Sequence, residues 1–330
     1  MEGAGGSGEL GSAAWSPPSE GEVYKILIPE GGMYRLTRDY LIAQGVAVDS
    51  MDLSQIRLFN LGEEVAIYVY DPNENHLLDI DEYIDLYALP VDTPYAKYAK
   101  HNVYWLTTSG GVGAVKRLGE IDATPLSADP EPTHTETIIF EENKRYWALA
   151  PGALSFDRWF YFQKIEGDKP PAEYTLSLPG LVDPGSLKIV LYGGVEMNHQ
   201  VDIWVNTHHQ GTYTWSGITR KEITIDPAPL QLGDNTIAMG ASGAEDVIVV
   251  DSFTCTYTRD FQAHSDLLEF SFEGNARFAV SDFTTDEVSL FDITSPPEVY
   301  KLTNAVITEG VPGSYQADFE PSAGAGTHRY

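Results

Sequence analysis

Short apolar segments with alternating polarity, separated by turn-forming residues, recur along most of this 330-residue chain. The segments are rich in aromatic residues (19 Tyr, 13 Phe and 6 Trp), and the 30 glycines and 20 prolines mostly fall between them. Aromatic and β-branched residues in short runs favour strands, whereas Gly, Pro, Asn and Asp favour turns. The pattern therefore predicts an all-β protein.

The strand pattern is densest between residues 134 and 262. The segments there with the length and composition of strands are 135–140, 159–163, 174–178, 187–192, 201–205, 213–215, 222–225, 236–239 and 247–258. Many short strands at such regular spacing are typical of a β-sandwich. We expect a sandwich of jelly-roll type, closed by the long alternating segment 251–258.

The sequence predicts smaller units on either side of this sandwich. Residues 22–121 read as a β-rich N-terminal domain in which Thr37 caps a short helix, 38–44, that Gly45 ends. Residues 1–21 are expected to be a flexible linker or a cloning remnant, and residues 122–133 a Pro- and Asp-rich linker. Residues 263–330 are expected to be a small β unit followed by a C-terminal linker, with a hairpin turn at Gly274-Asn275.

Charge and cysteine usage exclude several classes of function. The chain has 49 acidic and 20 basic side chains, a formal net charge of −29, which argues against nucleic-acid binding. Its one cysteine, Cys255, excludes an intrachain disulfide and a cysteine zinc cluster, and strand alternation favours a buried structural thiol. No segment has the length of a membrane-spanning helix. We expect an extracellular or cell-surface protein, with no signal peptide in this chain.

An acid- and amide-rich segment, residues 71–82, has the oxygen spacing of a calcium loop. The candidate ligands are Asp71, Asn73, Asn75, the carbonyl of Leu77, Asp79 and Glu82. They occupy the first, third, fifth, seventh, ninth and twelfth positions of an EF-hand-type loop. His76 stands at the sixth position, where that loop needs Gly for its positive φ. The alternative is a polar connection between strands that end at Tyr70 and begin at Tyr83.

Aromatic residues of the expected sandwich form a second candidate site, for carbohydrate. The residues are Trp204, Tyr213 and Trp215, with Asn198 and His199 nearby in sequence. Ring faces with polar neighbours are suited to stacking on the apolar face of a sugar. The alternative is that these aromatic residues belong to the core.

No catalytic set emerges from the sequence. It contains no Gly-x-Ser-x-Gly elbow and no His-Glu-x-x-His motif, and Gly110–Gly113 lacks the Lys-Ser/Thr of a phosphate loop. The pair His208-His209 reads as part of a surface loop. Carboxylate pairs are too frequent in so acidic a chain to indicate glycosidase chemistry. A hydrolase that acts through scattered carboxylates is the remaining enzymatic reading.

Short motifs spread along the chain resemble those of one protein family. They are Gly32–Thr37, Ile84–Tyr87, Asp92–Tyr95, Asn102–Leu106, His134, Glu141–Asn143, Asp157–Phe160, Tyr174–Gly180 and Val288–Thr294. In order and spacing they resemble the N-terminal, non-catalytic region of gingipain-type cysteine peptidases, over about residues 23–330. These are secreted bacterial enzymes with a caspase-like catalytic domain.

The resemblance implies a non-enzymatic accessory or pro-region, whose partner is a downstream caspase-like peptidase domain. No catalytic residue of the family has a counterpart in this chain. The alternative function is a carbohydrate-binding or surface-adhesion module that recognises glycans or cell-surface components. The family often has a Gly-rich acidic loop before the strand that resembles 83–87, and here Asn and His replace those glycines.

Overall fold

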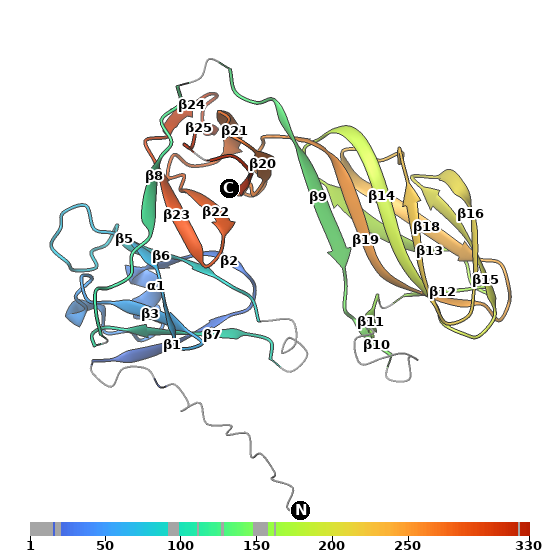
Figure 1. Ribbon diagram of the computed structural model, residues 1–330, viewed down its shortest axis with the longest axis horizontal. Helices are drawn as coiled ribbons and strands as arrows, with labels where there is room; N and C mark the ends of the chain where they lie inside the picture. Colours follow the sequence, from blue (N-terminus) through green and yellow to red (C-terminus); the bar gives the residue numbers. More distant parts are fainter. Residues whose placement is uncertain are drawn as a thin grey trace, which may run out of the picture. The chain divides into compact units, whose positions relative to one another are not determined.

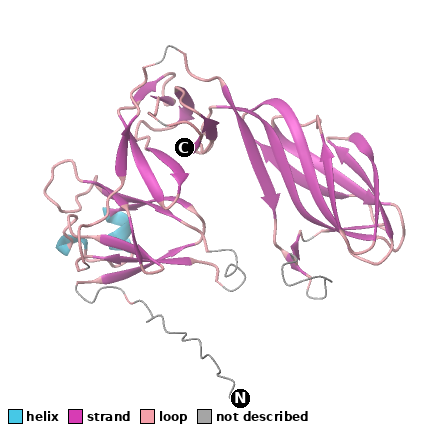
Figure 2. Cartoon of the chain, viewed as in Figure 1, coloured by secondary structure: helices cyan, strands magenta, loops and turns pink. Residues whose placement is uncertain are grey.

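The computed structural model describes residues 16, 21–91, 99–110, 112–126, 129–147, 158–161, 163–322 and 324–330. These residues form antiparallel sheets with one short α-helix and one short 3-10 helix (Figures 1 and 2). The all-β prediction is confirmed. In this part of the chain no helix is long and apolar enough to cross a membrane. The motif Asp92–Tyr95 and the motif residue Asp157 lie outside the described residues.

The chain divides into two compact units. The first comprises Met1–Ile121 and Ser289–Thr303, and the second comprises Asp122–Val288 and Asn304–Tyr330. From the sequence we expect residues 289–303 in the C-terminal β unit, whereas in the structure they complete the first unit. Each unit is therefore built from segments far apart in sequence.

Three small sheets make up the first unit. The first sheet has the order β1-β7-β3-β4 and the second β2-β6-β5. The third has the order β22-β23-β8. The elements are β1 (Val23–Ile28), β2 (Gly32–Thr37), α1 (Arg38–Ala43), η1 (Val48–Ser50), β3 (Arg57–Asn60), β4 (Glu63–Val65), β5 (Ile67–Tyr70), β6 (Tyr83–Ala88), β7 (Asn102–Thr107), β8 (Gly119–Asp122), β22 (Leu290–Ser295) and β23 (Glu298–Thr303).

Two apolar clusters hold this unit together. The larger one packs side chains of β1 to β7 with the helix residue Leu41. The smaller one joins the hairpin β22–β23 to sheet β2-β6-β5 through Tyr87, Leu118, Ile293 and Val299. Helix α1 begins as predicted, because the Thr37 hydroxyl accepts a hydrogen bond from the Tyr40 N–H at 3.2 Å.

The second unit contains the β-sandwich of jelly-roll type that the sequence predicts. One sheet has the order β12-β19-β14-β17, with β9 also paired to β19, and the other has the order β13-β18-β15-β16. Their strands are β9 (Thr133–Glu141), β12 (Lys164–Glu166), β13 (Ala172–Leu178), β14 (Leu181–Gly193), β15 (Asn198–Val205), β16 (His208–Ser216), β17 (Arg220–Ile225), β18 (Gly233–Ala241) and β19 (Val247–Asp260). A short ribbon, β10 (Arg145–Tyr146) with β11 (Trp159–Phe160), lies beside them.

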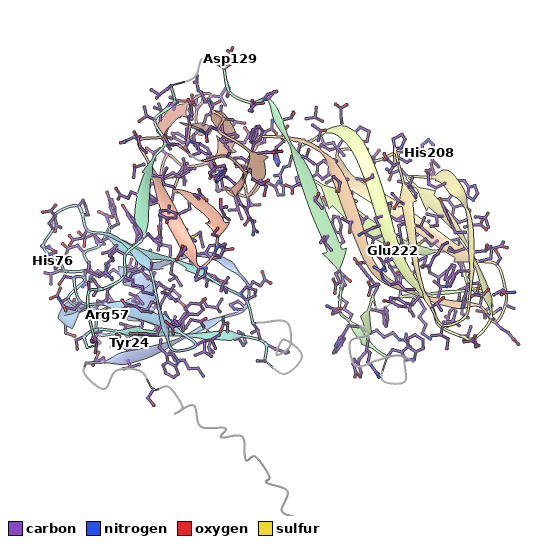
Figure 3. All side chains as sticks on the ribbon, in the orientation of Figure 1. Tyr24, Arg57, His76, Asp129, His208 and Glu222 are labelled. Carbon is purple, nitrogen blue, oxygen red and sulfur yellow. The ribbon has the colours of Figure 1, made fainter. Side chains whose placement is uncertain are left out.

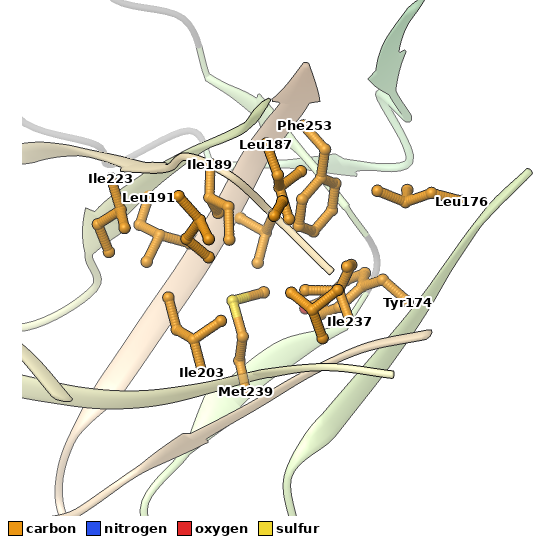
Figure 4. Packing of buried hydrophobic residues seen from close by; sticks show 14 of the residues in the cluster. Tyr174, Leu176, Leu187, Ile189, Leu191, Ile203, Ile223, Ile237, Met239 and Phe253 are labelled. Carbon is orange, nitrogen blue, oxygen red and sulfur yellow. The ribbon is translucent and has the colours of Figure 1, made fainter. Parts of the chain in front are cut away.

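The core of the sandwich forms where the two sheets face each other. Figure 4 shows Ile203 and Met239 from one sheet opposite Leu187, Ile189 and Leu191 from the other. These five side chains are fully buried. Alternate residues of each strand point into this layer, which is why the sequence has a two-residue period.

Two small sheets complete the second unit. One pairs β20 (Ser271–Glu273) with β26 (Thr327–Arg329), and the other has the order β21 (Phe278–Phe283), β25 (Tyr315–Phe319), β24 (Val306–Glu309). The hairpin predicted at Gly274-Asn275 is wrong, because β20 pairs with the C-terminal strand and not with β21. The Gly274 N–H donates to the carbonyl of Gly326, also on the C-terminal segment.

Candidate functional site

The segment 71–82 is an ordered loop that joins β5 to β6. Tyr70 and Tyr83, at its two ends, stack with their ring centroids 4.8 Å apart. Leu78 is buried in the core of the unit, and the carbonyl of His76 accepts a hydrogen bond from the Leu53 N–H at 2.8 Å. The core and the neighbouring turn therefore fix the loop at both ends and in its middle. Figure 3 labels His76 on this loop.

The structure brings most of the predicted calcium ligands together. Asn73 donates from Nδ2 to Asp79 Oδ2 at 3.1 Å and to Glu82 Oε1 at 3.0 Å. Asn75 donates from Nδ2 to the same Asp79 oxygen at 2.9 Å. Hydrogen bonds from Asn75 and Asn73 lower the pKa of Asp79. The Asn73 amide thus lies between two carboxylates and the Asn75 amide lies against one of them, where positive charge is favourable.

Asp71, at the first position of the loop, has an oxygen without a partner. Its Oδ2 accepts the His76 N–H at 2.9 Å, whereas its Oδ1 is buried and accepts no hydrogen bond. The Asp71 side chain is only 10% exposed. His76 has a φ of 62°, so the sixth position takes the conformation that a calcium loop requires although it is not Gly. An unsatisfied buried carboxylate oxygen is costly unless a cation or water meets it.

The loop differs from a cage built of carboxylates. Within the described residues no three His, Cys, Asp or Glu side chains are gathered in a way that could hold a metal ion. Amide oxygens and a carbonyl would have to supply the remaining ligands. Asn73 and Asn75 would also have to turn their side-chain oxygens inward, because both now point Nδ2 toward the carboxylates.

The predicted carbohydrate residues lie on two faces of one sheet. His199 is buried, and the rings of Tyr213 and Trp215 pack against the sandwich core. Trp204 and Asn198 have the opposite phase on β15 and point away from that core. The five residues therefore do not form one platform. The two-residue period of the sequence distinguishes the outward-facing residues from the inward-facing ones, since Trp204 is followed by the buried Val205 and points to the opposite face.

His199 is part of a buried polar network. Its Nδ1 lies 2.6 Å from Asp246 Oδ1, its Nε2 lies 3.0 Å from the carbonyl of Val195, and its ring stacks on Trp215. Asp246 also accepts the Gln200 N–H at 3.1 Å. Both ring nitrogens of His199 face acceptors, so neither is free to bind a sugar. The residue instead connects neighbouring loops and strands.

The only cysteine of the chain is unsuited to nucleophilic catalysis. Cys255 is fully buried in the sandwich core, where burial raises its pKa to about 12. A thiol becomes a nucleophile through its thiolate, which this environment disfavours.

A pocket that the sequence did not predict opens at one side of the sandwich. Its volume is about 670 Å³, and it is lined from β9, the residues after it, residues 161 and 163, and β13. The lining comes from three separate segments, so no local motif could have revealed it.

Comparisons with known proteins indicate the fold. No protein-family model matches the chain, and no curated protein matches its sequence. The crystal structure of dimeric latent PorU from Porphyromonas gingivalis is similar over 94% of this chain, with a TM-score of 0.65 and 13% identity. The chain spans about a third, 32%, of the length of that protein. At this identity the likeness concerns the fold alone.

Shorter structures match little more than a third of the chain. CBM35 from Cellvibrio japonicus Abf62 is 18% identical over 38% of this chain and 97% of its own, with a TM-score of 0.28. The carbohydrate-binding module CBM36 in complex with calcium and xylotriose is 13% identical over 35% of this chain and 97% of its own, with a TM-score of 0.26. Scores this low carry no argument about the function of this chain.

Proposed function

We propose that this chain is a non-enzymatic accessory or pro-region of a secreted gingipain-type cysteine peptidase. It acts on the folding or activity of a catalytic domain elsewhere in the same parent protein. The observation that supports the proposal is the extent of the likeness to latent PorU, 94% of this chain against 32% of that one. A similar extent, residues 23–330, follows from the sequence motifs that resemble the gingipain type.

The test adds the purified chain to the catalytic domain of the same parent protein. Peptidase activity and the yield of refolded catalytic domain are measured with and without it, and the chain alone is assayed as a blank. A regulatory or folding role predicts a change that saturates with chain concentration. If neither activity nor refolding changes, or if the chain alone cleaves peptides, the proposed role is wrong.

A calcium ion at the loop 71–82 is a second proposal, which the unpartnered Asp71 Oδ1 favours. The residues that would hold it are Asp71, Asn73, Asn75, the carbonyl of Leu77, Asp79 and Glu82. The ion would neutralise the carboxylates and fix the connection between β5 and β6. Its role would be structural, since a ligand that binds only the native state stabilises it.

Thermal unfolding in chelator and in excess calcium tests this site. A hundredfold excess over the dissociation constant should add about 2.7 kcal/mol to the free energy of unfolding. Asp79→Asn should abolish the shift, and Asp49→Asn, which removes an exposed carboxylate of the same unit, should preserve it. Asn73→Asp should destabilise the protein in chelator and enlarge the calcium shift, because it adds a carboxylate to the cluster. If calcium raises the unfolding temperature of neither the wild type nor any of these variants, the proposed site is wrong.

Carbohydrate binding remains the alternative function. Of the five predicted residues, Trp204 has the best placement, because its ring faces away from the core beside Gly240 and lies 5.2 Å from the His209 ring. A glycan array with the chain and with Trp204→Ala tests it. Binding that Trp204→Ala abolishes supports a sugar site on this face, and absence of binding to every glycan rejects it.

A further inference from the structure

The pocket at the side of the sandwich lies at the point along β19 where its pairing partner changes from β9 to β12. β9 pairs with β19 as far as Glu141, opposite Ser252. Beyond that point the Tyr161 N–H donates to the carbonyl of Val250 at 3.1 Å, and β12 continues the pairing from Lys164. The exchange leaves a pocket of about 670 Å³ that also faces β13.

Two tyrosines form a rigid floor in this pocket. The rings of Tyr161 and Tyr174 meet edge to face at 88°, with centroids 5.4 Å apart, and are 8% and 6% exposed. Phe253 supports both rings from the core, at 5.5 Å and 5.2 Å. Burial raises the pKa of both tyrosines, so their hydroxyls remain neutral. The floor is therefore uncharged, aromatic and held in place before any ligand arrives.

The rim of the pocket is acidic. Three of its side chains are glutamates, Glu141, Glu142 and Glu173, and the one cation among its lining residues is Lys144. Lys144 pairs with Glu142 at 2.7 Å. Among the described residues Glu141 has an amide partner, Asn143 at 3.1 Å, and neither it nor Glu173 forms an ion pair with any of them. Among the described residues, two carboxylates at the rim of the pocket therefore have no positive partner.

The strands on both sides of the pocket have open edges. Within the part of the chain that the structure describes, β9 pairs only with β19, and β13 pairs only with β18. An edge strand offers unpaired N–H and C=O groups to an added strand. Ile139, which lines the pocket from β9, is 64% exposed and adds apolar surface next to this edge.

We propose that this pocket binds an extended peptide segment of a partner protein through an arginine or lysine side chain. The aliphatic stem of that side chain lies on the tyrosine floor, and its charged head meets Glu141 and Glu173. The backbone of the segment adds to the edge of β9 or β13, as in other strand-addition complexes. A neutral sugar fits less well, because it would leave the negative charges of Glu141 and Glu173 without a counter-charge. This inference goes beyond the accessory role and does not depend on it.

Fluorescently labelled short peptides test the proposal on the full chain. In one peptide Arg alternates with Thr, and in two matched peptides Glu or Ser replaces the Arg. Fluorescence anisotropy should show binding of the Arg peptide alone, weakening as salt rises. Glu141→Gln combined with Glu173→Gln should weaken it by about tenfold or more. Glu222 lies on β17, at the edge opposite β9 of the sheet that contains both strands (Figure 3), so Glu222→Gln should leave the affinity for the Arg peptide unchanged.

A charge reversal makes the test independent of the wild-type affinity. Glu141→Lys with Glu173→Lys should bind the Glu peptide and lose the Arg peptide. Both positions are exposed, so these variants should unfold at the wild-type temperature. Equal binding of the three peptides, or an unchanged affinity in the Gln variant, overturns the proposal. Binding of a neutral oligosaccharide that the Gln variant weakens, with no peptide binding, also overturns it in favour of a sugar pocket.

Discussion

His134 is a buried titratable residue in an aromatic cluster of the second unit. Its ring lies 4.9 Å from Phe261 and 5.4 Å from Phe270, and its Nε2 is buried without a partner. Burial lowers its pKa to about 4, and the nearby Arg259 acts in the same direction. The folded protein therefore holds this histidine neutral at a pH where the unfolded chain would protonate it.

The position of His134 predicts a loss of stability in mild acid. A depressed pKa means that its contribution is present above the unfolded value, near 6.5, and is lost as the pH falls toward 4. The full effect corresponds to roughly 3 kcal/mol. Urea unfolding between pH 7 and pH 4 should show a steeper decline for the wild type than for His134→Phe. Equal slopes in the two proteins would contradict this assignment.

The burial of Cys255 predicts that a thiol reagent does not reach the core of the native sandwich. Because the thiol is fully buried and its pKa is raised to about 12, a thiol reagent should not modify it in the native protein. Modification should begin only at denaturant concentrations that unfold the sandwich. Following the reaction with an aromatic disulfide alongside intrinsic fluorescence gives the two transitions in one experiment. Rapid modification without denaturant would mean that the sandwich opens locally near β19.

The arrangement of single residues was only partly predictable. Alternation correctly placed Cys255 with Phe253 and Tyr257 inside the sandwich, since a two-residue period is written in the local sequence. The burial of His199 is different, because its polar neighbour Asp246 is distant in sequence. No local pattern shows that a polar side chain has such a partner.

At the scale of elements, a buried ion pair anchors the segment that follows β7. Arg57 on β3 binds Glu64 on β4 at 2.6 Å, with side-chain exposures of 6% and 12%. Arg57 also donates to the carbonyl of Gly113 at 2.5 Å, and Glu64 accepts the Lys116 N–H at 2.7 Å. The pair therefore connects a hairpin to a loop some fifty residues further along the chain.

Glu64→Ala should destabilise the first unit strongly. It leaves the Arg57 guanidinium buried without its counter-charge, which typically costs about 3–5 kcal/mol. The matched control is Asp49→Ala, which removes the surface pair of Arg38 and Asp49, where Asp49 is 88% exposed. Exposed pairs contribute at most about 1 kcal/mol. Denaturant unfolding of both variants compares them, and equal losses would show that the buried pair has no special role.

Elements set by local chemistry were predictable, and pairings across the chain were not. Thr37 and Gly45 bound the helix because a cap depends only on residues within one turn. The pairing of β20 with β26 depends on residues more than fifty positions away, so Gly274 alone could not indicate it. The loop 71–82 is intermediate. Its spacing was readable from the sequence, but the inward direction of the Asn73 and Asn75 amides was not.

At the scale of the whole molecule, the two units are interleaved along the chain. Residues 289–303 leave the second unit, complete the first, and return at Asn304. Within the first unit Arg35 donates to the Ser289 hydroxyl at 2.8 Å, and the Lys301 ammonium lies 4.5 Å from the Phe291 ring centroid. Burial lowers the pKa of Lys301 to about 8. The first unit therefore depends on residues 289–303, which are synthesised long after its other strands.

This interleaving predicts that a fragment ending at residue 121 is incompletely folded. Without β22 and β23 it exposes Tyr87 and Leu118, which Ile293 and Val299 cover in the whole chain. The fragment should bind a hydrophobic dye and unfold at lower urea than one in which a flexible linker joins residues 289–303 to its end. Val299→Ala in the linked fragment should reverse part of the gain, by about 2 kcal/mol, because it removes two buried methyl groups. Equal stability and dye binding of the linked and unlinked fragments would show that the hairpin is dispensable to the unit.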